Sequence, residues 1–305
     1  MRYIVVSIDT PPQEIDRRCE ELTALGAGGC MIESEDDFQG FLEENRQYWD
    51  YVDEGLEQAF KGVSRVTCYL TDDEDGEATL ARIKAAFPQA HSDYTEDKDW
   101  ENDWRNYYEP IEVGKRIVVV PEWMDAPSDG RVPLRLDPGI AFGTGSHPTT
   151  KLCLAALEDF ITPDTRVLDL GCGSGILGIG ALLLGAAHCT GCDIDPLAGE
   201  AAAANAALNG IGGDRLSTYT GNIIKDAALR GRLGGGYRLV LANIVADVII
   251  SLSAFARQFM AEDGVFICSG IIDDRADEVR AALVKNGFEI LSHSREEEWH
   301  CFVCR

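Results

Sequence analysis

A glycine-rich turn between two apolar segments constrains this chain more than any other feature. The segment VLDLGCGSG, residues 167–175, runs from a strand-like stretch into Gly171, Gly173 and Gly175, and the helix-like GILGIGALLLG follows. Glycine permits a positive φ and a close approach of the backbone to a ligand. Ile176 stands where a dinucleotide fingerprint has its third glycine, so the spacing predicts a ligand-binding α/β turn of a different kind.

An acidic residue follows at the distance that such a turn needs. Asp193 ends the next apolar run, CDID, 22 positions after Gly171. A carboxylate at the end of the second strand accepts hydrogen bonds from both ribose hydroxyls of an adenosine. The alternative role, a helix N-cap before Pro196, fits Asp195 better than Asp193. Because free N–H groups at a helix N-terminus suit a carboxylate, the pattern predicts a pocket for an adenosine-containing cofactor.

The order of elements after residue 166 predicts a doubly wound parallel sheet. Strand-like runs alternate with helix-like ones: RVLDL, AHCTGCDID, RLSTYTG, YRLVLANI and GVFICSG are separated by GILGIGALLLG, PLAGEAAAANAALNG and ADVIISLSAFARQFM. The end of the chain, FEILSHSREEEWHCFVC, reads as two strands joined by a short polar turn. This hairpin places an antiparallel last strand in the sheet. Class I methyltransferases end in this way, whereas nicotinamide-binding Rossmann domains usually do not.

Four further residues are candidates for the same pocket. Asn243 ends the strand-like LVLAN, at the edge where open α/β sheets bind ligands, and its amide suits the cofactor or an incoming amine; a turn-forming asparagine is the alternative. The spacing of Thr150 in GTGSHPTT favours a helix cap over a cofactor contact. A loop histidine such as His147 is more often structural than a general base. Trp299, followed by His300, is more often part of a core than of a substrate wall.

The N-terminal part, residues 1–95, predicts a smaller α+β domain. Its strand-like and helix-like segments follow the order strand–helix–strand–strand–helix–strand, which is the ferredoxin-like pattern. Residues 36–60 form an acidic, aromatic insertion that suits a helix or a long loop. Charged and aromatic residues interleave in residues 96–110, which we interpret as a connector, and residues 111–305 form the second domain. A chain of 305 residues suits two domains.

Charge and hydropathy narrow the class of partner. The formal net charge is −25, and roughly two thirds of the excess lies before residue 111. An acidic surface repels phosphate backbones, so a nucleic acid is a poor partner and a basic protein is a natural one, although a charge that serves solubility alone is as good an explanation. No apolar run is long enough to span a bilayer, and the N-terminus lacks the features of a secretion signal. We therefore expect a cytoplasmic protein.

Two cysteine pairs have the CxxC spacing, Cys189 with Cys192 and Cys301 with Cys304. Together they suggest a four-thiolate zinc site. Both pairs lie in strand-like runs without the tight turn that a zinc knuckle needs, and residues three apart in a strand point to opposite faces. We therefore interpret them as buried thiols and expect no metal site.

At this point a family resemblance adds to the residue patterns. The segments DPGIAFGTGSHPTT, VLDLGCGSGILGIGALLLGA, CDIDPLA, LANI and EEEWHCF resemble those of the ribosomal protein L11 methyltransferases, and WENDWRNYYEPIEVGKRIVVVPEW is similar to their domain connector. The resemblance covers residues 95–305 in specific motifs and the N-terminal domain in general pattern. It implies a class I S-adenosylmethionine-dependent protein N-methyltransferase with cofactor contacts at Thr150, Gly171, Asp193 and Asn243, which reverses the preference for Thr150 as a cap.

The resemblance also implies a substrate and a division of labour. The substrate is ribosomal protein L11, trimethylated at lysine ε-amines and at the N-terminal α-amine, with the N-terminal domain holding it while the connector lets the catalytic domain swing between targets. Two alternatives remain: a methyltransferase that acts on another protein or a small-molecule amine, and a non-catalytic binding protein, which the intact pocket residues argue against. A nucleic-acid methyltransferase is disfavoured by the charge, and because Asn243 is followed by Ile244 and Val245 rather than by two prolines.

No dedicated catalytic base is evident in the sequence. An amine must be neutral to attack a methyl group, and deprotonating a lysine at neutral pH costs about 4 kcal/mol, against under about 1 kcal/mol for an α-amine. We expect positioning to supply most of the catalysis, with carbonyl oxygens around Asn243 orienting the amine and bulk water accepting the proton.

Overall fold

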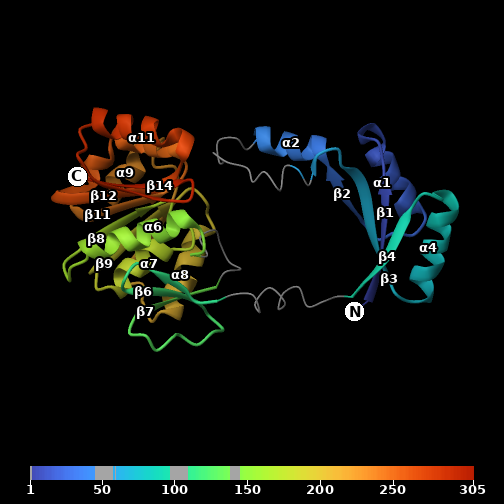
Figure 1. Ribbon diagram of the computed structural model, residues 1–305, viewed down its shortest axis with the longest axis horizontal. Helices are drawn as coiled ribbons and strands as arrows, with labels where there is room; N and C mark the ends of the chain where they lie inside the picture. The colour runs from blue at the N-terminus through green and yellow to red at the C-terminus, as the bar shows by residue number, and fades with distance from the viewer. Residues whose placement is uncertain (1, 45–57, 59, 97–108, 138–144) are drawn as a thin grey trace. The chain divides into compact units, whose positions relative to one another are not determined.

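The computed structural model describes residues 2–44, 58, 60–96, 109–137 and 145–305. The chain divides into two compact units, residues 1–108 and 109–305, and Figure 1 labels the elements of both. Part of the acidic insertion (45–57 and 59) and most of the expected connector (97–108) lie outside the described residues. No helix among the described residues is long and apolar enough to cross a membrane.

The first unit is an antiparallel sheet with helices on one face. Its elements are β1 (Arg2–Asp9), η1 (Pro12–Glu14), α1 (Ile15–Ala24), β2 (Cys30–Ser34), α2 (Glu35–Glu44), β3 (Ser64–Thr71), α4 (Glu74–Ala86) and β4 (His91–Glu96). The strand order is β2-β3-β1-β4, and all three pairs are antiparallel. This is the predicted ferredoxin-like arrangement, with α2 forming the first part of the acidic insertion.

Period-two burial explains why this sheet forms. Ile4, Val6 and Ile8 on β1 are fully buried, while the residues between them are partly exposed. They pack with Leu22 of α1 and Ile83 of α4 in one core. A strand that alternates in this way buries one face against helices, which fixes its register.

The second unit begins with a small sheet that the sequence analysis did not distinguish from the main sheet. Its strands are β5 (Ile111–Val113), β6 (Ile117–Pro121) and β7 (Val132–Leu136), in the order β5-β6-β7. The helix α6 (Pro148–Leu157) and the turn η4 (Glu158–Phe160) follow. The apolar residues of this small sheet share a core with α6 and α7.

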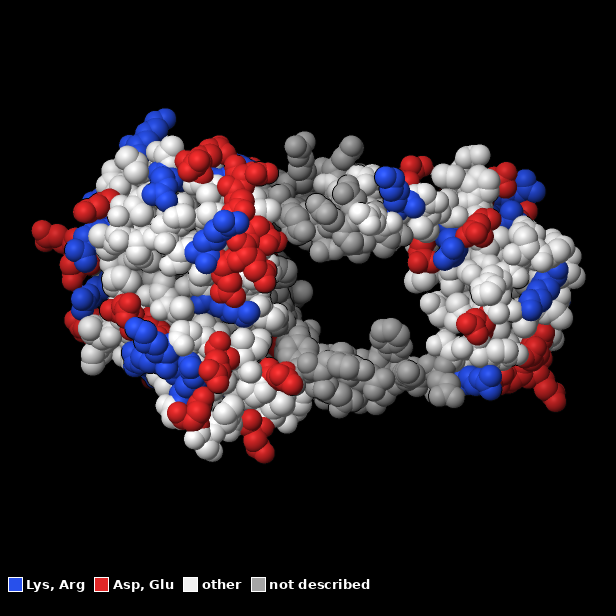
Figure 2. All heavy atoms as spheres, in the orientation of Figure 1, with Lys and Arg blue, Asp and Glu red and all other residues white. Residues whose placement is uncertain are grey.

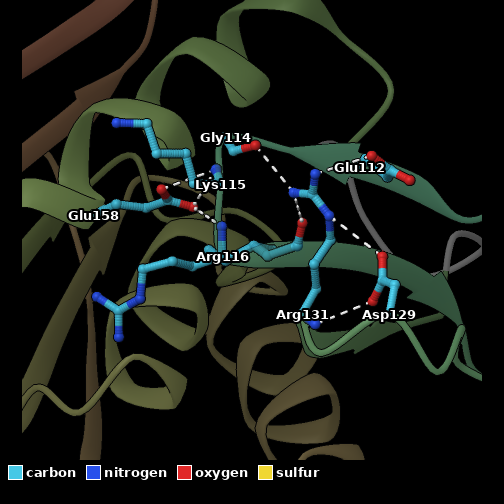
Figure 3. Close-up of polar contacts among 8 residues, drawn as sticks. Glu112, Gly114, Lys115, Arg116, Asp129, Arg131 and Glu158 are labelled. Carbon is cyan, nitrogen blue, oxygen red and sulfur yellow. Dashed lines mark hydrogen bonds and ion pairs between the residues drawn. The ribbon is translucent and has the colours of Figure 1, made fainter.

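A buried carboxylate links the small sheet to the end of α6 by hydrogen bonds. Glu158 accepts hydrogen bonds from the backbone N–H of Lys115, at 3.0 Å, and of Arg116, at 2.8 Å. Gly114 has φ +55°, and a Cβ there would lie 2.6 Å from Oε1 of Glu158. On the other side of the turn, Arg131 donates to the Gly114 carbonyl oxygen (Figure 3). The turn between β5 and β6 is therefore held from both sides, and glycine is required at its tightest point.

The main sheet has seven strands. Its elements are β8 (Arg166–Leu170), α7 (Ile176–Leu183), β9 (His188–Asp193), α8 (Ala198–Leu208), β10 (Leu216–Thr220), α9 (Ala227–Leu233), β11 (Tyr237–Asn243), α10 (Ala246–Ser253), η5 (Ala256–Phe259), β12 (Met260–Ile272), α11 (Asp273–Lys285), β13 (Ile290–Glu296) and β14 (Trp299–Cys304). The order is β10-β9-β8-β11-β12-β14-β13. Strand β14 runs antiparallel between β12 and β13. The predicted fold is confirmed, and the short helix α9 is an addition to it.

Helices cover both faces of this sheet and create two cores. One core contains residues of α6, α7 and α8, and the other contains residues of α9, α10 and α11. Cys189 lies in the first core and Cys192 in the second, and Cys301 and Cys304 divide in the same way. The members of each CxxC pair therefore point to opposite faces, as predicted from the strand period. Burial raises the pKa of the Cys189 thiol, so it stays protonated.

We predict that Glu158→Ala lowers the free energy of unfolding of the second unit by about 1–3 kcal/mol, because the backbone N–H groups of Lys115 and Arg116 lose their acceptor. Urea unfolding monitored by circular dichroism measures the loss. Glu200 on α8 is exposed, so Glu200→Ala is the matched control and should change stability by under about 0.5 kcal/mol. Equal stabilities for the two variants would show that water replaces the carboxylate.

Candidate active site

Three predicted site residues meet at one edge of the main sheet. Strand β8 lies between β9 and β11 and is parallel to both. Gly171 follows the end of β8, while Asp193 and Asn243 end β9 and β11. The chain runs from β8 outward to β9 and β10 and then returns to β11 on the other side of β8. Open α/β sheets bind ligands at such a reversal of strand order, beyond the carboxyl ends of the strands.

The glycine turn is held in a conformation that other residues rarely adopt. Gly171, Gly173 and Gly175 have φ values of +74°, +47° and +80°. The N–H of Gly171 donates to the carbonyl oxygen of Cys192 at 2.8 Å. A Cβ on Gly171 would lie 2.4 Å from Cγ2 of Ile244. The turn thus requires glycine both for its backbone angles and for the close approach of the segment after β11.

Asp193 is bound directly to the glycine turn. Its Oδ2 accepts from the N–H of Gly173 at 2.8 Å, and its Oδ1 accepts from the N–H of Asp195 at 3.0 Å. The side chain is partly exposed, and each carboxylate oxygen has a further lone pair. Asp195 accepts from the N–H of Leu197 in the turn that precedes α8, so it organises the start of that helix while Asp193 stays available to a ligand.

Thr150 and Asn243 also meet. The amide Nδ2 of Asn243 donates to Oγ1 of Thr150 at 3.3 Å, although 93 positions separate them in the chain. Thr150 is buried, and its own N–H donates to the carbonyl oxygen of His147. The spacing-based preference for Thr150 as a helix cap was wrong, because the N-cap of α6 is His147 and Thr150 lies within the helix.

His147 has a structural role. Its Nδ1 accepts from the N–H of Thr149 at 3.3 Å and lies 2.8 Å from the hydroxyl of the same residue. An acceptor Nδ1 places the single proton of the neutral ring on Nε2. Burial lowers the pKa of His147 below its ordinary value. The ring also packs edge-on against Trp299, with centroids 4.8 Å apart. A histidine used in this way has no free basic nitrogen for catalysis.

His300, next to Trp299, belongs to a chain of hydrogen bonds. It is buried, its Nε2 lies 2.6 Å from Oδ1 of Asp273, and its Nδ1 lies 2.6 Å from Nε2 of His293. His293 in turn contacts Arg280 at 2.9 Å. These contacts join β13, β14 and α11, so His300 supports the terminal hairpin.

Sequence reasoning missed one buried carboxyl beside the candidate site. Asp169 lies within the buried strand β8, two positions before Gly171, and is 1% exposed. Its Oδ2 accepts from the N–H of Gly178 at 3.1 Å, and its Oδ1 has no hydrogen-bond partner among the described residues. Burial raises its pKa to about 7. The signal was present in VLDLG, because an acidic residue inside an apolar strand needs a partner.

Comparisons with known proteins agree over the whole chain. The model of the family described as ribosomal protein L11 methyltransferase (PrmA) matches residues 2–305. The ribosomal protein L11 methyltransferase of Caldanaerobacter subterraneus is 35% identical over 311 residues, 98% of this chain and 97% of that protein. The one from Heliobacterium modesticaldum is 36% identical over 321 residues, 100% of this chain and 98% of that protein.

A solved structure is also similar. The ribosomal protein L11 methylase of Lactobacillus delbrueckii subsp. bulgaricus shares 34% identity with a TM-score of 0.59. The match covers 65% of this chain and 98% of that one.

We predict that Gly171→Ala destabilises the protein by about 1–3 kcal/mol more than Gly210→Ala, because an added methyl group overpacks against Ile244. Gly210 has φ +68°, close to the +74° of Gly171, and nothing lies within 4 Å of its added Cβ. It therefore carries the same backbone strain without the contact. Urea unfolding compares the two variants, and equal losses would mean that Ile244 moves aside.

Proposed function

Because the chain belongs to the ribosomal protein L11 methyltransferase (PrmA) family, we propose that it transfers methyl groups from S-adenosylmethionine to lysine ε-amines and the N-terminal α-amine of ribosomal protein L11. The observation that carries this proposal is the joining of Gly173 to Asp193 and of Thr150 to Asn243 at one edge of the sheet. Neither pair is close in sequence, so the fold itself assembles the site.

The residues of the pocket fit the cofactor. We assign the ribose hydroxyls to Asp193, whose carboxylate is oriented by Gly173 and Asp195, and the close backbone approach to Gly171 and Gly173. The buried Oδ1 of Asp169 lacks a partner among the described residues. An ammonium group such as that of the methionine part would satisfy it, since a buried carboxylate requires a paired charge.

Thr150 and Asn243 complete the proposed pocket. Because the amide nitrogen of Asn243 donates to Thr150, its carbonyl oxygen is left as an acceptor. Such an acceptor suits an N–H of the incoming amine or of the cofactor. The contact with the buried Thr150 fixes the rotation of that amide.

Bound S-adenosylmethionine supplies a methyl group already activated on a sulfonium. The residues of the chain then have to orient the amine and keep it neutral, which costs about 4 kcal/mol for a lysine at pH 7. His147 is engaged as a helix cap, and we propose that the proton leaves to bulk water. A steep pH dependence removed by mutating one histidine or carboxylate would contradict this.

The two units divide the work in this proposal. Residues 1–95 hold the protein substrate, residues 96–110 connect, and residues 111–305 carry out the transfer. The net charge of −25 suits a basic protein partner in the cytoplasm. In Figure 2, Lys and Arg are interspersed with Asp and Glu over the visible face of residues 109–305. That mixture offers a nucleic acid no continuous basic groove on this face.

We predict that the purified protein, incubated with S-adenosylmethionine and ribosomal protein L11, produces a ladder of methyl additions in the intact mass of L11. Asp193→Ala should abolish the ladder and weaken cofactor binding at least about tenfold, because charge-assisted hydrogen bonds are lost. Glu200→Ala, at an exposed position on α8, is the control and should retain activity. If calorimetry shows cofactor binding but the mass of L11 does not change, the assignment as a methyltransferase stands and L11 is not the substrate. The alternative, another protein or a small-molecule amine as substrate, is then favoured.

We also predict that cofactor binding at pH 7 releases a fraction of a proton, because burial raises the pKa of Asp169 to about 7 and a cation beside it favours the ionised form. Calorimetry in buffers of different ionisation enthalpy measures the release. In Asp169→Asn, which keeps an acceptor for Gly178, the release should fall by that amount. Identical proton release by the unmodified protein and Asp169→Asn would mean that the cationic group of the cofactor does not lie beside Asp169.

The same raised pKa has a consequence for stability without cofactor. A carboxyl whose folded-state pKa lies above its unfolded value stabilises the fold at low pH and loses that contribution as the pH rises through about 7. The Tm of Asp169→Asn relative to the unmodified protein should therefore increase from pH 5 to pH 8.

A further inference from the structure

One buried amide joins the glycine turn to a second segment of the catalytic unit. Asn205 lies in the middle of α8 and is 0% exposed. Its Nδ2 donates to the carbonyl oxygen of Ser174 at 2.9 Å, and its Oδ1 accepts from the N–H of Asp137 at 3.0 Å. Ser174 lies between Gly173 and Gly175, and Asp137 follows the end of β7. A single side chain thus fixes two backbone segments that are far apart in sequence.

The face of α8 around Asn205 is shaped for this contact. Ala202 lies one turn earlier, and a Cβ on Gly175 would lie 2.9 Å from that of Ala202. Small residues on the helix and glycine in the turn bring the two backbones close enough for the amide of Asn205 to reach Ser174. Because a buried amide costs stability unless its groups are paired, the turn and the helix are held at one separation.

Gly145 packs closely against the start of α7. Gly145 has φ +87°, and a Cβ there would lie 3.2 Å from Cδ1 of Ile176, the first residue of α7. Gly145 leads into α6, which carries Thr150.

We propose that Asn205 is a positioning residue for S-adenosylmethionine. By holding the Ser174 carbonyl, it fixes the N–H of Gly173 that orients the carboxylate of Asp193. It acts through the backbone and need not touch the cofactor. This inference rests on the proposed cofactor pocket and adds a determinant of cofactor affinity outside it.

The same helix provides a matched control four residues further on. Asn209 donates from Nδ2 to the Arg135 carbonyl oxygen at 2.7 Å and accepts from the Arg135 N–H at 2.8 Å. It therefore links β7 to α8 through a side-chain amide, as Asn205 links its two segments. Among the described residues, its side chain bonds to Arg135 and to the Asn205 carbonyl oxygen, and not to the glycine turn. A loss of helix or strand stability alone should affect both variants in the same way.

The experiment compares Asn205→Ala with Asn209→Ala in the full-length chain. Calorimetry with S-adenosylhomocysteine gives Kd, thermal unfolding gives Tm, and steady-state kinetics give KM and kcat. We expect Asn205→Ala to raise the Kd and the KM for S-adenosylmethionine at least tenfold, with kcat at saturation within threefold. Asn209→Ala should lower Tm with Kd within threefold. Equal values of Kd for the two variants would overturn the proposal.

Asn205→Asp is a second test that does not depend on the alanine variant folding. Its carboxylate keeps an acceptor for the Asp137 N–H but faces the Ser174 carbonyl oxygen, which only a protonated carboxyl can approach as a donor. The pKa in the bound state is then raised, so cofactor affinity relative to the unmodified protein should recover as the pH falls from 8 to 5.5. A ratio of Kd values that does not change with pH would contradict the positioning role. If the unmodified protein fails to bind S-adenosylhomocysteine, the proposed function fails instead.

Discussion

The hydrogen bond from the Gly173 N–H to the Asp193 carboxylate is the interaction on which the rest of the site depends. It joins the turn after β8 to the end of β9, and it forms only if the two strands are parallel neighbours in the observed register. That register in turn requires a buried sheet with helices on both faces. The positive φ angles of the glycines and the small residues of α8 allow the turn to adopt the conformation in which the Gly173 N–H points at the Asp193 carboxylate.

The same region contains a carboxyl group whose burial is electrostatically unfavourable. Asp169 is a carboxyl buried under the glycine turn with one oxygen unpaired among the described residues, and its pKa is raised to about 7 because water is excluded. An amide, which keeps an acceptor for the Gly178 N–H without a buried charge, would suit the folded state better. In the proposed complex a cationic ligand group would reverse that balance, so the feature that weakens the protein without cofactor would strengthen the complex. Stability and affinity therefore oppose each other at Asp169.

The sequence was sufficient for the features that depend on local pattern. Alternation on β1 and the strand–turn–helix at Gly171 predicted the two folds, and the terminal hairpin predicted the antiparallel β14. Contacts between segments that are distant in the chain could not be predicted from such local patterns. The cap is His147 rather than Thr150, because the helix begins at Pro148, three residues earlier than a cap at Thr150 implies. Asn205 looked like one more polar residue in an alanine-rich helix, since nothing local shows that Ser174 and Asp137 meet there.

The polar groups at this edge of the sheet are engaged in holding positions, which bears on the chemistry. Asp193 is oriented by two N–H groups, Asn243 donates to Thr150, and His147 caps α6. None of these arrangements offers a basic atom reserved for one proton. An enzyme that relies on positioning makes few demands on the rest of its substrate beyond a neutral amine at the right place. Such a site suits both lysine ε-amines and an α-amine, provided that another part of the chain presents each of them in turn.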